Sequence, residues 1–498
     1  MIKTIGYVMI FTVIGKLLGF IRELLLSYYF GASGISDAYL ISQTIPGTIF
    51  QFVGTGLATC FIPVFYSIKS EKGIDTANNY TNKITTIILL FSTIVIVLIW
   101  CFTYETVKIF ASGFEGENLK YAIIFTRIGI CTLYVSTLIY VYNSYLQANE
   151  KFMPTAFSAL PYNIAIIIAI LLGDYKNIYF LAIGSAIATV IQLICLIIPM
   201  LGIGYFYKPN FRFKDKYIKK FFMLLIPVIM GVSVNEINIL VDRTIASQIA
   251  VGGISALTYA NSLIMFIQGG LSQSIITVCY PKISSMVTNS NFHKLKKFMK
   301  NSIIILIILL LPISMWFVTL SSPIVNLLFG RGAFDKNAMD MTQDGLKFYA
   351  IGIPFLGIRE LLSRYFYAFE DTKTPMKNST IGVFINICFN IIFSRIWGIG
   401  GLAFATTFSA IITSILLWIE CKTKIKIAIS NINFYEISKI IFANIIMTLS
   451  IKYIYTILPL SDVFKLSATV IISSVIYITL LLLMRVEICV NIKNKMKI

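Results

Sequence analysis

The residues of this chain that could do chemistry are ionisable side chains inside otherwise apolar stretches. A charged side chain that faces lipid costs about 2.5–3.5 kcal/mol on insertion scales, so we expect the group to face a wet interior. The alternative for any single member is neutralisation by a neighbouring charge, or a position near a helix end from which it reaches water. The six cationic and five anionic members are Lys16, Arg22, Arg127, Arg243, Arg359, Arg364, Glu23, Asp37, Glu236, Asp242 and Glu360.

The spacing of these residues places opposite charges on one helix face. Lys16 and Glu23 are seven residues apart, as are Glu236 and Arg243, so the members of each pair lie two helical turns apart on the same side. Arginine suits phosphate because its planar guanidinium forms two parallel, charge-assisted hydrogen bonds. A cavity lined in this way would offer a basic patch to a phosphate and keep carboxylates for a coupling ion.

Motifs for catalysis are missing from the sequence. It contains no P-loop, no HExxH zinc motif and no nucleophile elbow. His293 is the only histidine, and the eight cysteines lie in or beside apolar runs without a CxxC pair. We therefore expect a transporter and not an enzyme, with membrane glycosyltransfer as the rival function. Without an ATP site, transport would depend on ion gradients or on the membrane potential.

The composition predicts an all-α polytopic membrane protein. Of the 498 residues, 57% are hydrophobic and 13% are charged, with a mean hydropathy of +0.84. Soluble domains have about 45–50% apolar and 25% charged residues. The net charge of +19 would suggest a nucleic-acid partner in a soluble protein, but the basic residues lie mostly in short loops, so no nucleic-acid partner is expected.

Apolar runs predict fourteen transmembrane helices. A span needs about 20 predominantly apolar residues, and polar, Gly/Pro or charged stretches separate the runs. The predicted helix cores are 5–30, 37–66, 84–110, 121–147, 155–172, 178–206, 218–249, 254–286, 301–320, 343–369, 376–396, 400–419, 435–457 and 465–486. The first run carries its charges too deep to be a cleavable signal peptide, so we expect it to stay in the mature protein.

The distribution of Lys and Arg predicts the orientation. With the N-terminus in the cytoplasm, 25 basic residues fall in the inside loops and termini and eight fall in the outside loops. The inside set includes Lys426 and, in the C-terminal tail, Lys493, Lys495 and Lys497. Because cytoplasmic loops carry the excess of Lys and Arg, both termini are predicted to be cytoplasmic.

Three short sequence segments recur with a nearly constant offset. Those at 34–36, 61–63 and 148–150 resemble those at 253–255, 278–281 and 368–370, at offsets of 219, 218 and 220 residues. Six helices is an even number, so the two halves form a parallel repeat around an axis along the membrane normal, as in alternating-access transporters. The predicted division is an N-terminal lobe at 1–207, a C-terminal lobe at 208–426, and an accessory helix pair with a cytoplasmic tail at 427–498.

Several longer sequence motifs resemble those of the MurJ/MviN family. They are Gly19-Phe20-Ile21-Arg22-Glu23, Ser36-Asp37-Ala38-Tyr39, the stretch 231–243 with its Val241-Asp242-Arg243, and the stretch 365–375. The resemblance spans residues about 10–420 and implies fourteen helices. It also implies a lipid II flippase of the multidrug/oligosaccharidyl-lipid/polysaccharide exporter superfamily. Such a protein carries the undecaprenyl-pyrophosphate-linked peptidoglycan precursor outward across the bacterial cytoplasmic membrane, in cell-wall synthesis.

Carried over position by position, the resemblance assigns residues to the cavity. Arg22 and Asp37 match cavity residues of the family, and Lys16 stands where the family usually has arginine. Together with the charged helix faces, this gives a predicted substrate-binding set of Lys16, Arg22, Glu23, Asp37, Arg243 and Arg359.

Two positions depart from the family pattern. Phe50-Gln51 stands at the arginine-rich end of the second helix, and the stretch 259–263 lacks the arginine of the helix 8 motif. Either Arg243, Arg359 or Arg364 replaces these phosphate ligands, or the chain moves another polyprenyl-linked oligosaccharide of the capsule or teichoic type. A cation-coupled drug exporter is a further alternative, although it predicts about twelve helices.

The resemblance also implies a sodium site between helices 7, 11 and 12. Asp242, Asn386, Asn390 and Thr406 stand in the matching places, and oxygen ligands suit a hard cation. A polar contact between helices is the alternative interpretation. Apart from sodium as a coupling ion, no cofactor is expected. The expected partners are a lipid-linked glycan and membrane lipids, with the chain itself a monomer.

Overall fold

Helices make up every regular element in residues 2–424 and 434–489, the part of the chain that the computed structural model describes. The all-α class predicted from the sequence is therefore confirmed. Lys426, Lys493, Lys495 and Lys497, which were predicted to be cytoplasmic, lie outside the described residues. The chain forms two compact units, Met1–Ser255 with Gly332–Phe334, and Ala256–Arg331 with Asp335–Ile498.

The first unit holds the helices up to α8, and the second begins within α9. In the first unit the helices are α1 (Ile2–Phe30), α2 (Gly34–Gly56), the π-helix η1 (Leu57–Phe61), α3 (Ile62–Cys101), α4 (Thr103–Phe110), α5 (Gly116–Ala148), α6 (Met153–Tyr175), α7 (Tyr179–Gly202) and α8 (Lys216–Ile249). The others are α9 (Gly253–Ile267), the π-helix η2 (Gln268–Ser272), α10 (Gln273–Thr288), α11 (Phe292–Thr319), α12 (Ser321–Phe329), α13 (Lys336–Ile351), α14 (Ile353–Ala368), α15 (Lys373–Lys424), α16 (Phe434–Ile457) and α17 (Asp462–Leu483).

Ten helices in the described part are long and apolar enough to cross a membrane. Several of these rods are longer than the predicted runs, because the chain stays helical where loops were predicted. The stretch 67–83 is helical apart from a break at Gly73, whose φ of 82° and ψ of 175° suit only glycine. In α15 the corresponding break falls at Trp397 and Gly398.

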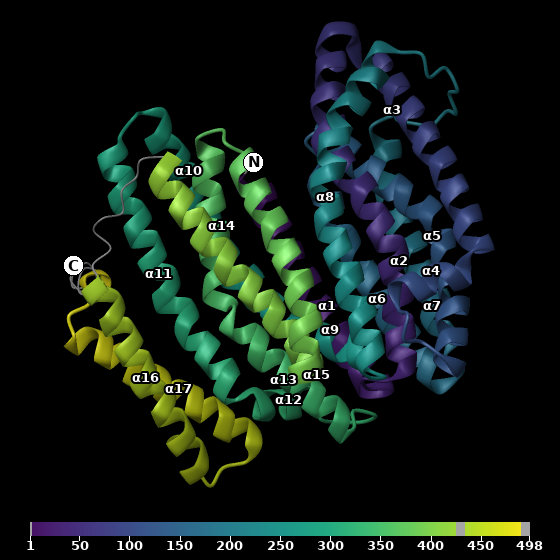
Figure 1. Ribbon diagram of the computed structural model, residues 1–498. Coiled ribbons are helices and arrows are strands. Elements are labelled where there is room, and N and C mark those ends of the chain that lie inside the picture. Colours follow the sequence, from purple (N-terminus) through teal and green to yellow (C-terminus); the bar gives the residue numbers. More distant parts are fainter. Residues whose placement is uncertain (1, 425–433, 490–498) are drawn as a thin grey trace. The chain divides into compact units, whose positions relative to one another are not determined.

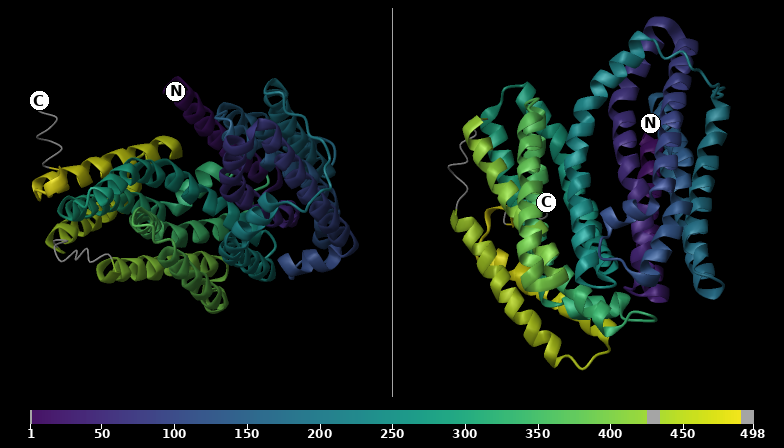
Figure 2. Two further views of the ribbon diagram at one scale, coloured as in Figure 1. Left: turned by 90° about the horizontal axis from the view of Figure 1, so that it is seen from above. Right: turned by 45° about the vertical axis from the view of Figure 1, so that its right-hand side comes forward.

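The first unit is a bundle of long helices (Figure 1). In it, α6 packs against α1 and α7, and α5 packs against α2, α3 and α7. The right-hand view of Figure 2 shows the long helices of this unit running nearly parallel. Helix α8 packs against α2, α3 and α4, so packing joins it to the helices that precede it. The division at 207/208 follows the repeat in the sequence and stays a prediction.

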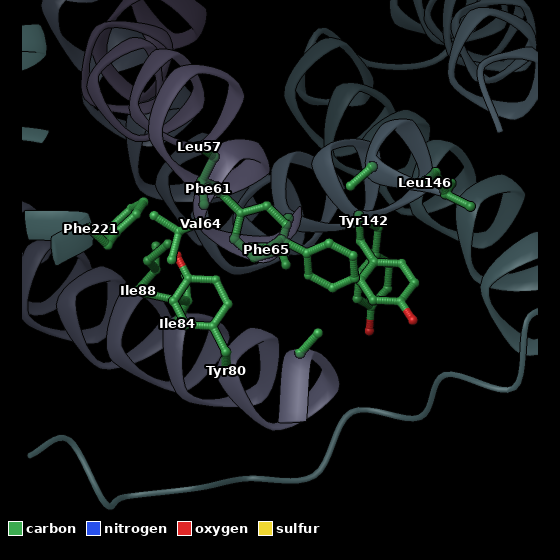
Figure 3. Close-up of a cluster of buried hydrophobic side chains, with 14 of the residues drawn as sticks. Leu57, Phe61, Val64, Phe65, Tyr80, Ile84, Ile88, Tyr142, Leu146 and Phe221 are labelled. Atoms are coloured by element: carbon green, nitrogen blue, oxygen red, sulfur yellow. The ribbon is translucent and has the colours of Figure 1, made fainter. Parts of the chain in front are cut away.

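An aromatic core holds α3 and α5 together in the first unit (Figure 3). The ring of Phe61 lies 5.4 Å from that of Tyr80, and the ring of Phe65 lies 5.2 Å from that of Tyr145. The ring of Tyr205, from the segment after α7, lies 4.6 Å from that of Tyr145 and is tilted against it by 39°. Each such pair contributes about 0.5–1.5 kcal/mol beyond the area it buries. The core therefore fixes the segment after α7 against the bundle.

The second unit is built around α15 and α11. Helix α15 packs against α13 and α14, and α11 packs against α13, α14 and α16. The accessory helices α16 and α17 pack on each other, and the indole Nε1 of Trp316 in α11 donates a 3.0 Å hydrogen bond to Ser473 in α17. The C-terminal pair is thus held on α11 by a specific polar contact.

Candidate functional site

A cavity of about 440 Å³ lies among five helices of the first unit. Helices α1, α2, α5, α6 and α7 all contribute to its wall. This volume falls within the ~300–1,000 Å³ of typical small-molecule sites. Because every lining residue belongs to one compact unit, the cavity is a property of the first bundle alone.

Helical spacing explains why these side chains share one wall. On α5 the lining residues Thr132, Ser136, Tyr140 and Asn143 follow one another at intervals of three or four residues. On α2 the lining residues include Tyr39, Gln43, Gly47 and Phe50, at intervals of three or four residues. Each of the two helices therefore turns one continuous, partly polar stripe toward the cavity.

The charged part of the wall is a pair of neighbours on α1. The Nη2 of Arg22 lies 2.8 Å from Oε1 of Glu23, and Nη1 donates a 3.4 Å hydrogen bond to Oδ1 of Asn163 on α6. Arg22 is the only cationic residue among the described residues that line the cavity. The Arg22 side chain is 27% exposed and lines the cavity, so a ligand in the cavity can contact it.

Two acceptor oxygens on this wall have no hydrogen-bond partner among the described residues. They are Oε2 of Glu23 and Oδ1 of Asn143, and both atoms are buried. A buried polar atom without a partner costs about 1–3 kcal/mol. The wall is therefore suited to a ligand that brings hydrogen-bond donors as well as negative charge.

Asp37 lies on α2 and is fully buried. Its Oδ2 accepts a 2.8 Å hydrogen bond from the backbone N–H of Gly252, and its Oδ1 accepts 2.7 Å bonds from the N–H and the hydroxyl of Ser255. The carboxylate thus satisfies the free N–H groups where α9 begins, which is the role of a helix cap. Asp37 is not among the residues that line the cavity, and its role in substrate binding stays a prediction.

Arg243 approaches the same turn from α8. Its Nη1 donates a 3.0 Å hydrogen bond to the carbonyl oxygen of Ile254. Lys16 lies on α1 with an exposed side chain and is not part of the cavity wall. Of the predicted substrate-binding residues in the first unit, the cavity brings together Arg22 and Glu23.

The remaining predicted substrate residue, Arg359, lies on α14 in the second unit. Its neighbour Glu360 accepts hydrogen bonds from Gln273 on α10 and, at 3.2 Å, from Arg364. The guanidinium of Arg364 also lies 5.9 Å from the centre of the Tyr280 ring. This unit therefore holds a second group of charged residues, with one of its arginines already neutralised.

Three of the predicted sodium ligands lie near one another on α15. The Nδ2 of Asn386 donates a 3.2 Å hydrogen bond to Oγ1 of Thr406, and the Nδ2 of Asn390 donates a 2.8 Å bond to Oδ1 of Asn386. Asp242 lies on α8, where Asn238 donates a 3.5 Å bond to it. The described residues contain no group of three His, Cys, Asp or Glu side chains that could hold a metal.

Sequence reasoning missed the neutral part of the cavity wall. Gln43, Asn143 and Gln192 line it, but a neutral amide in an apolar run costs too little to stand out. Asn143 could have been found from the spacing of polar residues on α5, where Thr132, Ser136, Tyr140 and Asn143 recur every three or four positions. Phe50, noted because it stands where the family has arginine, does line the cavity, and its ring lies 5.9 Å from that of Tyr140.

The family is decided by comparison of the whole chain with known proteins. Residues 26–488 match the family described as "Lipid II flippase MurJ". The chain belongs to the MurJ family. This confirms the family resemblance seen in the sequence. Two MurJ relatives, each described as a "Probable lipid II flippase MurJ", show the extent of the match. The relative from Buchnera aphidicola subsp. Baizongia pistaciae is 29% identical over 84% of this chain and 82% of its own length. The relative from Rickettsia prowazekii is 26% identical over 98% of this chain and 97% of its own length.

Solved structures agree with the MurJ assignment. The structure titled "Lipid II flippase MurJ, inward closed conformation" is 28% identical and superposes with a TM-score of 0.81, covering 95% of this chain and 97% of the other. A multidrug resistance MATE family transporter of the MOP superfamily, in an inward-facing conformation, has a TM-score of 0.68 at 14% identity and covers 84% of this chain and 96% of the other. The likeness to the MATE transporter shows a shared fold. MurJ flippases are multi-pass proteins of the inner membrane.

Proposed function

We propose that this chain is a flippase that moves lipid II, the undecaprenyl-pyrophosphate-linked peptidoglycan precursor, from the cytoplasmic to the outer leaflet by alternating access. The observation that carries this proposal is Arg22, a partly exposed arginine side chain on the wall of a cavity, in a chain of the MurJ family. Arginine can grip a pyrophosphate with two charge-assisted hydrogen bonds at once. The lipid-linked substrate and the surrounding membrane lipids are its partners.

Glu23 holds Arg22 ready for this role. In the absence of substrate, its carboxylate neutralises the guanidinium at 2.8 Å and fixes its direction. When a pyrophosphate enters, the guanidinium can turn toward the phosphate oxygens. Such an exchange of partners avoids leaving a bare charge in the membrane, which would be costly.

The finer architecture is also a proposal. We place fourteen membrane crossings in this chain, with two six-helix lobes at 1–207 and 208–426, an accessory pair, and both termini in the cytoplasm. Support comes from Gly73 and Gly398, whose non-helical backbone angles interrupt two long helices. Each of these helices can therefore supply two membrane crossings. The excess of Lys and Arg in alternate loops supports the orientation. We assign the chain no catalytic reaction and no nucleic-acid partner, and propose that it acts as a monomer.

A sodium ion is the proposed coupling ion. Asn386, Asn390 and Thr406 support it because their hydrogen bonds gather amide and hydroxyl oxygens around one region of α15. The part of Asp242 in this site rests on the family resemblance. Binding to the folded state raises stability, by about 2.7 kcal/mol at a hundred times the Kd. The melting temperature of the purified protein should therefore rise in NaCl over choline chloride at equal ionic strength, and N390L should remove the difference.

Complementation tests the substrate. Cells depleted of their own lipid II flippase should grow when this chain is expressed, and R22A should fail at equal membrane abundance. Arg127 on α5 is a matched control, because its side chain is exposed and lies against Trp100, outside the cavity. R127A should therefore support growth. Failure of the unaltered chain despite good expression would contradict lipid II as the substrate and favour another polyprenyl-linked oligosaccharide.

A further inference from the structure

A second cavity in the first unit has a wholly apolar wall. It measures about 370 Å³ and lies between α2, α3 and α8, with Val53, Ile87, Phe91, Phe222 and Leu225 among its lining residues. Three further lining residues, Ile84, Ile88 and Phe221, belong to the hydrophobic core in Figure 3. No lining residue can donate or accept a side-chain hydrogen bond, so the groove suits a hydrocarbon chain and no polar ligand.

One end of this groove is marked by lysines. On α3, Lys83 directly precedes the lining residue Ile84, and on α8, Lys219 and Lys220 directly precede Phe221. Lys216, Lys219 and Lys220 are exposed. The segment 208–220 carries six basic residues and a single carboxylate, Asp215, whose Oδ2 is bound by the Nζ of Lys83 at 2.7 Å. Glu71 on α3 adjoins the same segment, where it accepts a 3.2 Å hydrogen bond from the hydroxyl of Tyr217. Basic residues therefore outnumber carboxylates at this end of the groove.

The basic segment is held in a fixed position beside the groove. The hydroxyl of Tyr205 donates a 2.8 Å hydrogen bond to Oδ1 of Asn82, which also accepts a 3.2 Å bond from the N–H of Lys208. The N–H of Asn210 donates a 3.1 Å bond to Oγ1 of Thr86. These bonds leave Phe206 and Phe211 exposed among the basic residues, at 61% and 65%. Exposed aromatic rings beside lysines are typical of the membrane interface.

We propose that this groove and its lysines bind one anionic phospholipid, with an acyl chain between α2, α3 and α8 and the headgroup phosphate at Lys216, Lys219 and Lys220. The apolar wall and the basic rim match the two halves of such a lipid. Both α3 and α8 belong to rods long enough to cross a membrane, and the lining residues Phe91 and Phe222 are exposed, so the groove opens at the surface of the bundle. This site is separate from the cavity at Arg22 and does not rest on the proposed transport function.

Native mass spectrometry of the full chain tests the proposal. The protein is released from nanodiscs of phosphatidylglycerol and phosphatidylcholine in equal amounts, and the retained lipid is identified. The unaltered chain should retain one phosphatidylglycerol in preference to phosphatidylcholine. Because each basic residue near an anionic lipid surface strengthens binding by about fivefold, K216Q/K219Q/K220Q should lower this retention by about a hundredfold.

A matched control uses three exposed lysines of the second unit. K282Q/K294Q/K297Q removes the same charge from residues that do not adjoin the groove, and it should retain the lipid as the unaltered chain does. Equal loss in both triple variants would overturn the proposal, because it would reduce the effect to net charge.

The apolar half of the site has its own test. I87W fills the groove and should lower retention at least tenfold, whereas V97W, at an exposed position of the same helix that does not line the groove, should leave it unchanged. Retention by I87W equal to that of V97W would overturn the placement of the acyl chain. Displacement of phosphatidylglycerol from the unaltered chain by an equal concentration of undecaprenyl phosphate would also overturn it, by assigning the groove to a polyprenyl tail.

Discussion

Oδ1 of Asp37 lies 2.7 Å from both the backbone nitrogen and the hydroxyl oxygen of Ser255, a residue 218 positions later in the chain. Its other oxygen accepts the N–H of Gly252. One carboxylate on α2 therefore closes the turn between α8 and α9. A buried helix start needs such a partner, because its first N–H groups have no acceptor within the helix.

We expect D37A to destabilise the protein strongly. The substitution leaves the N–H groups of Gly252 and Ser255 buried without acceptors, at a cost of about 1–3 kcal/mol each. The melting temperature in detergent should fall by several degrees, and D37N, which keeps one acceptor oxygen, should fall less. D75A is the control, because Asp75 is exposed. Equal melting temperatures for D37A and D75A would contradict the capping role.

Glycine at position 252 should be needed for the same turn. Its φ of 85° lies in the left-handed region, and a Cβ there would collide with the carbonyl oxygen of Ala32. G252A should therefore cost about 1–2 kcal/mol from the backbone alone, and more from the collision. G231A should have the opposite sign, because Gly231 lies inside α8 with open space around it and alanine favours a helix by about 1 kcal/mol. Thermal unfolding of both variants measures the contrast, and a stable G252A would show that the turn can relax.

Arg22 should be required for transport through its guanidinium geometry. Loss of a charge-assisted hydrogen bond costs about 1.5–3 kcal/mol, so R22A should transport at least tenfold more slowly in reconstituted vesicles. R22K should recover only part of the rate, because an ammonium group cannot form two parallel bonds. The paired variant R22Q/E23Q separates binding from charge balance. Full activity in that variant, with R22A defective, would give Arg22 a purely structural role.

The ion pair between Lys83 and Asp215 should make stability depend on pH. Burial alone would raise the pKa of Asp215, but the hydrogen bonds from Lys83 and from the N–H of Tyr217 lower it below its ordinary value. A carboxyl group with a lowered pKa stabilises the fold above its ordinary pKa of about 3.9, and this contribution is lost as the pH falls through the lowered value. K83M should therefore melt below the unaltered protein at pH 7, by an amount equivalent to about 1 kcal/mol, and the gap should narrow toward pH 3.

K214M is the control for that pH series. Lys214 adjoins Asp215 in the chain, but its side chain is exposed. Its melting temperature should follow that of the unaltered protein from pH 7 to pH 3. A gap for K83M that stays constant over this range would show that the effect comes from packing of the lysine stem.

The sequence predicted the helical class because apolar runs of spanning length have few other solutions. It misjudged the stretch 67–83, which polar residues suggested was a loop. There the chain remains helical, since backbone hydrogen bonds do not depend on side-chain polarity, and Gly73 alone changes its direction. The position of such a break depends on a single residue's φ, which hydropathy does not report.

The charged residues of the cavity wall could be predicted from the sequence. Arg22 and Glu23 stand out because a charge inside an apolar run is costly and rare. Asn143 and Gln192 carry no such penalty, so only their position on a common wall reveals them. The partners of Asp37 could not be predicted from the sequence. Two of its three donors are backbone N–H groups, 215 and 218 positions away, which residue type does not reveal, and the third is the hydroxyl of Ser255.

Helix α8 packs with helices that precede it, although the repeat in the sequence counts it as the first helix of the second half. If the chain arose by duplication of a six-helix ancestor, the point where the two copies were joined in the gene lies before α8. The boundary between the two packed units lies one helix later, after α8. A gene split within 203–215 would leave the first fragment without a helix of its own bundle, while a split after Ser255 would keep α8 with the helices it packs on. Coexpressed halves of the second kind should therefore be the more soluble in detergent.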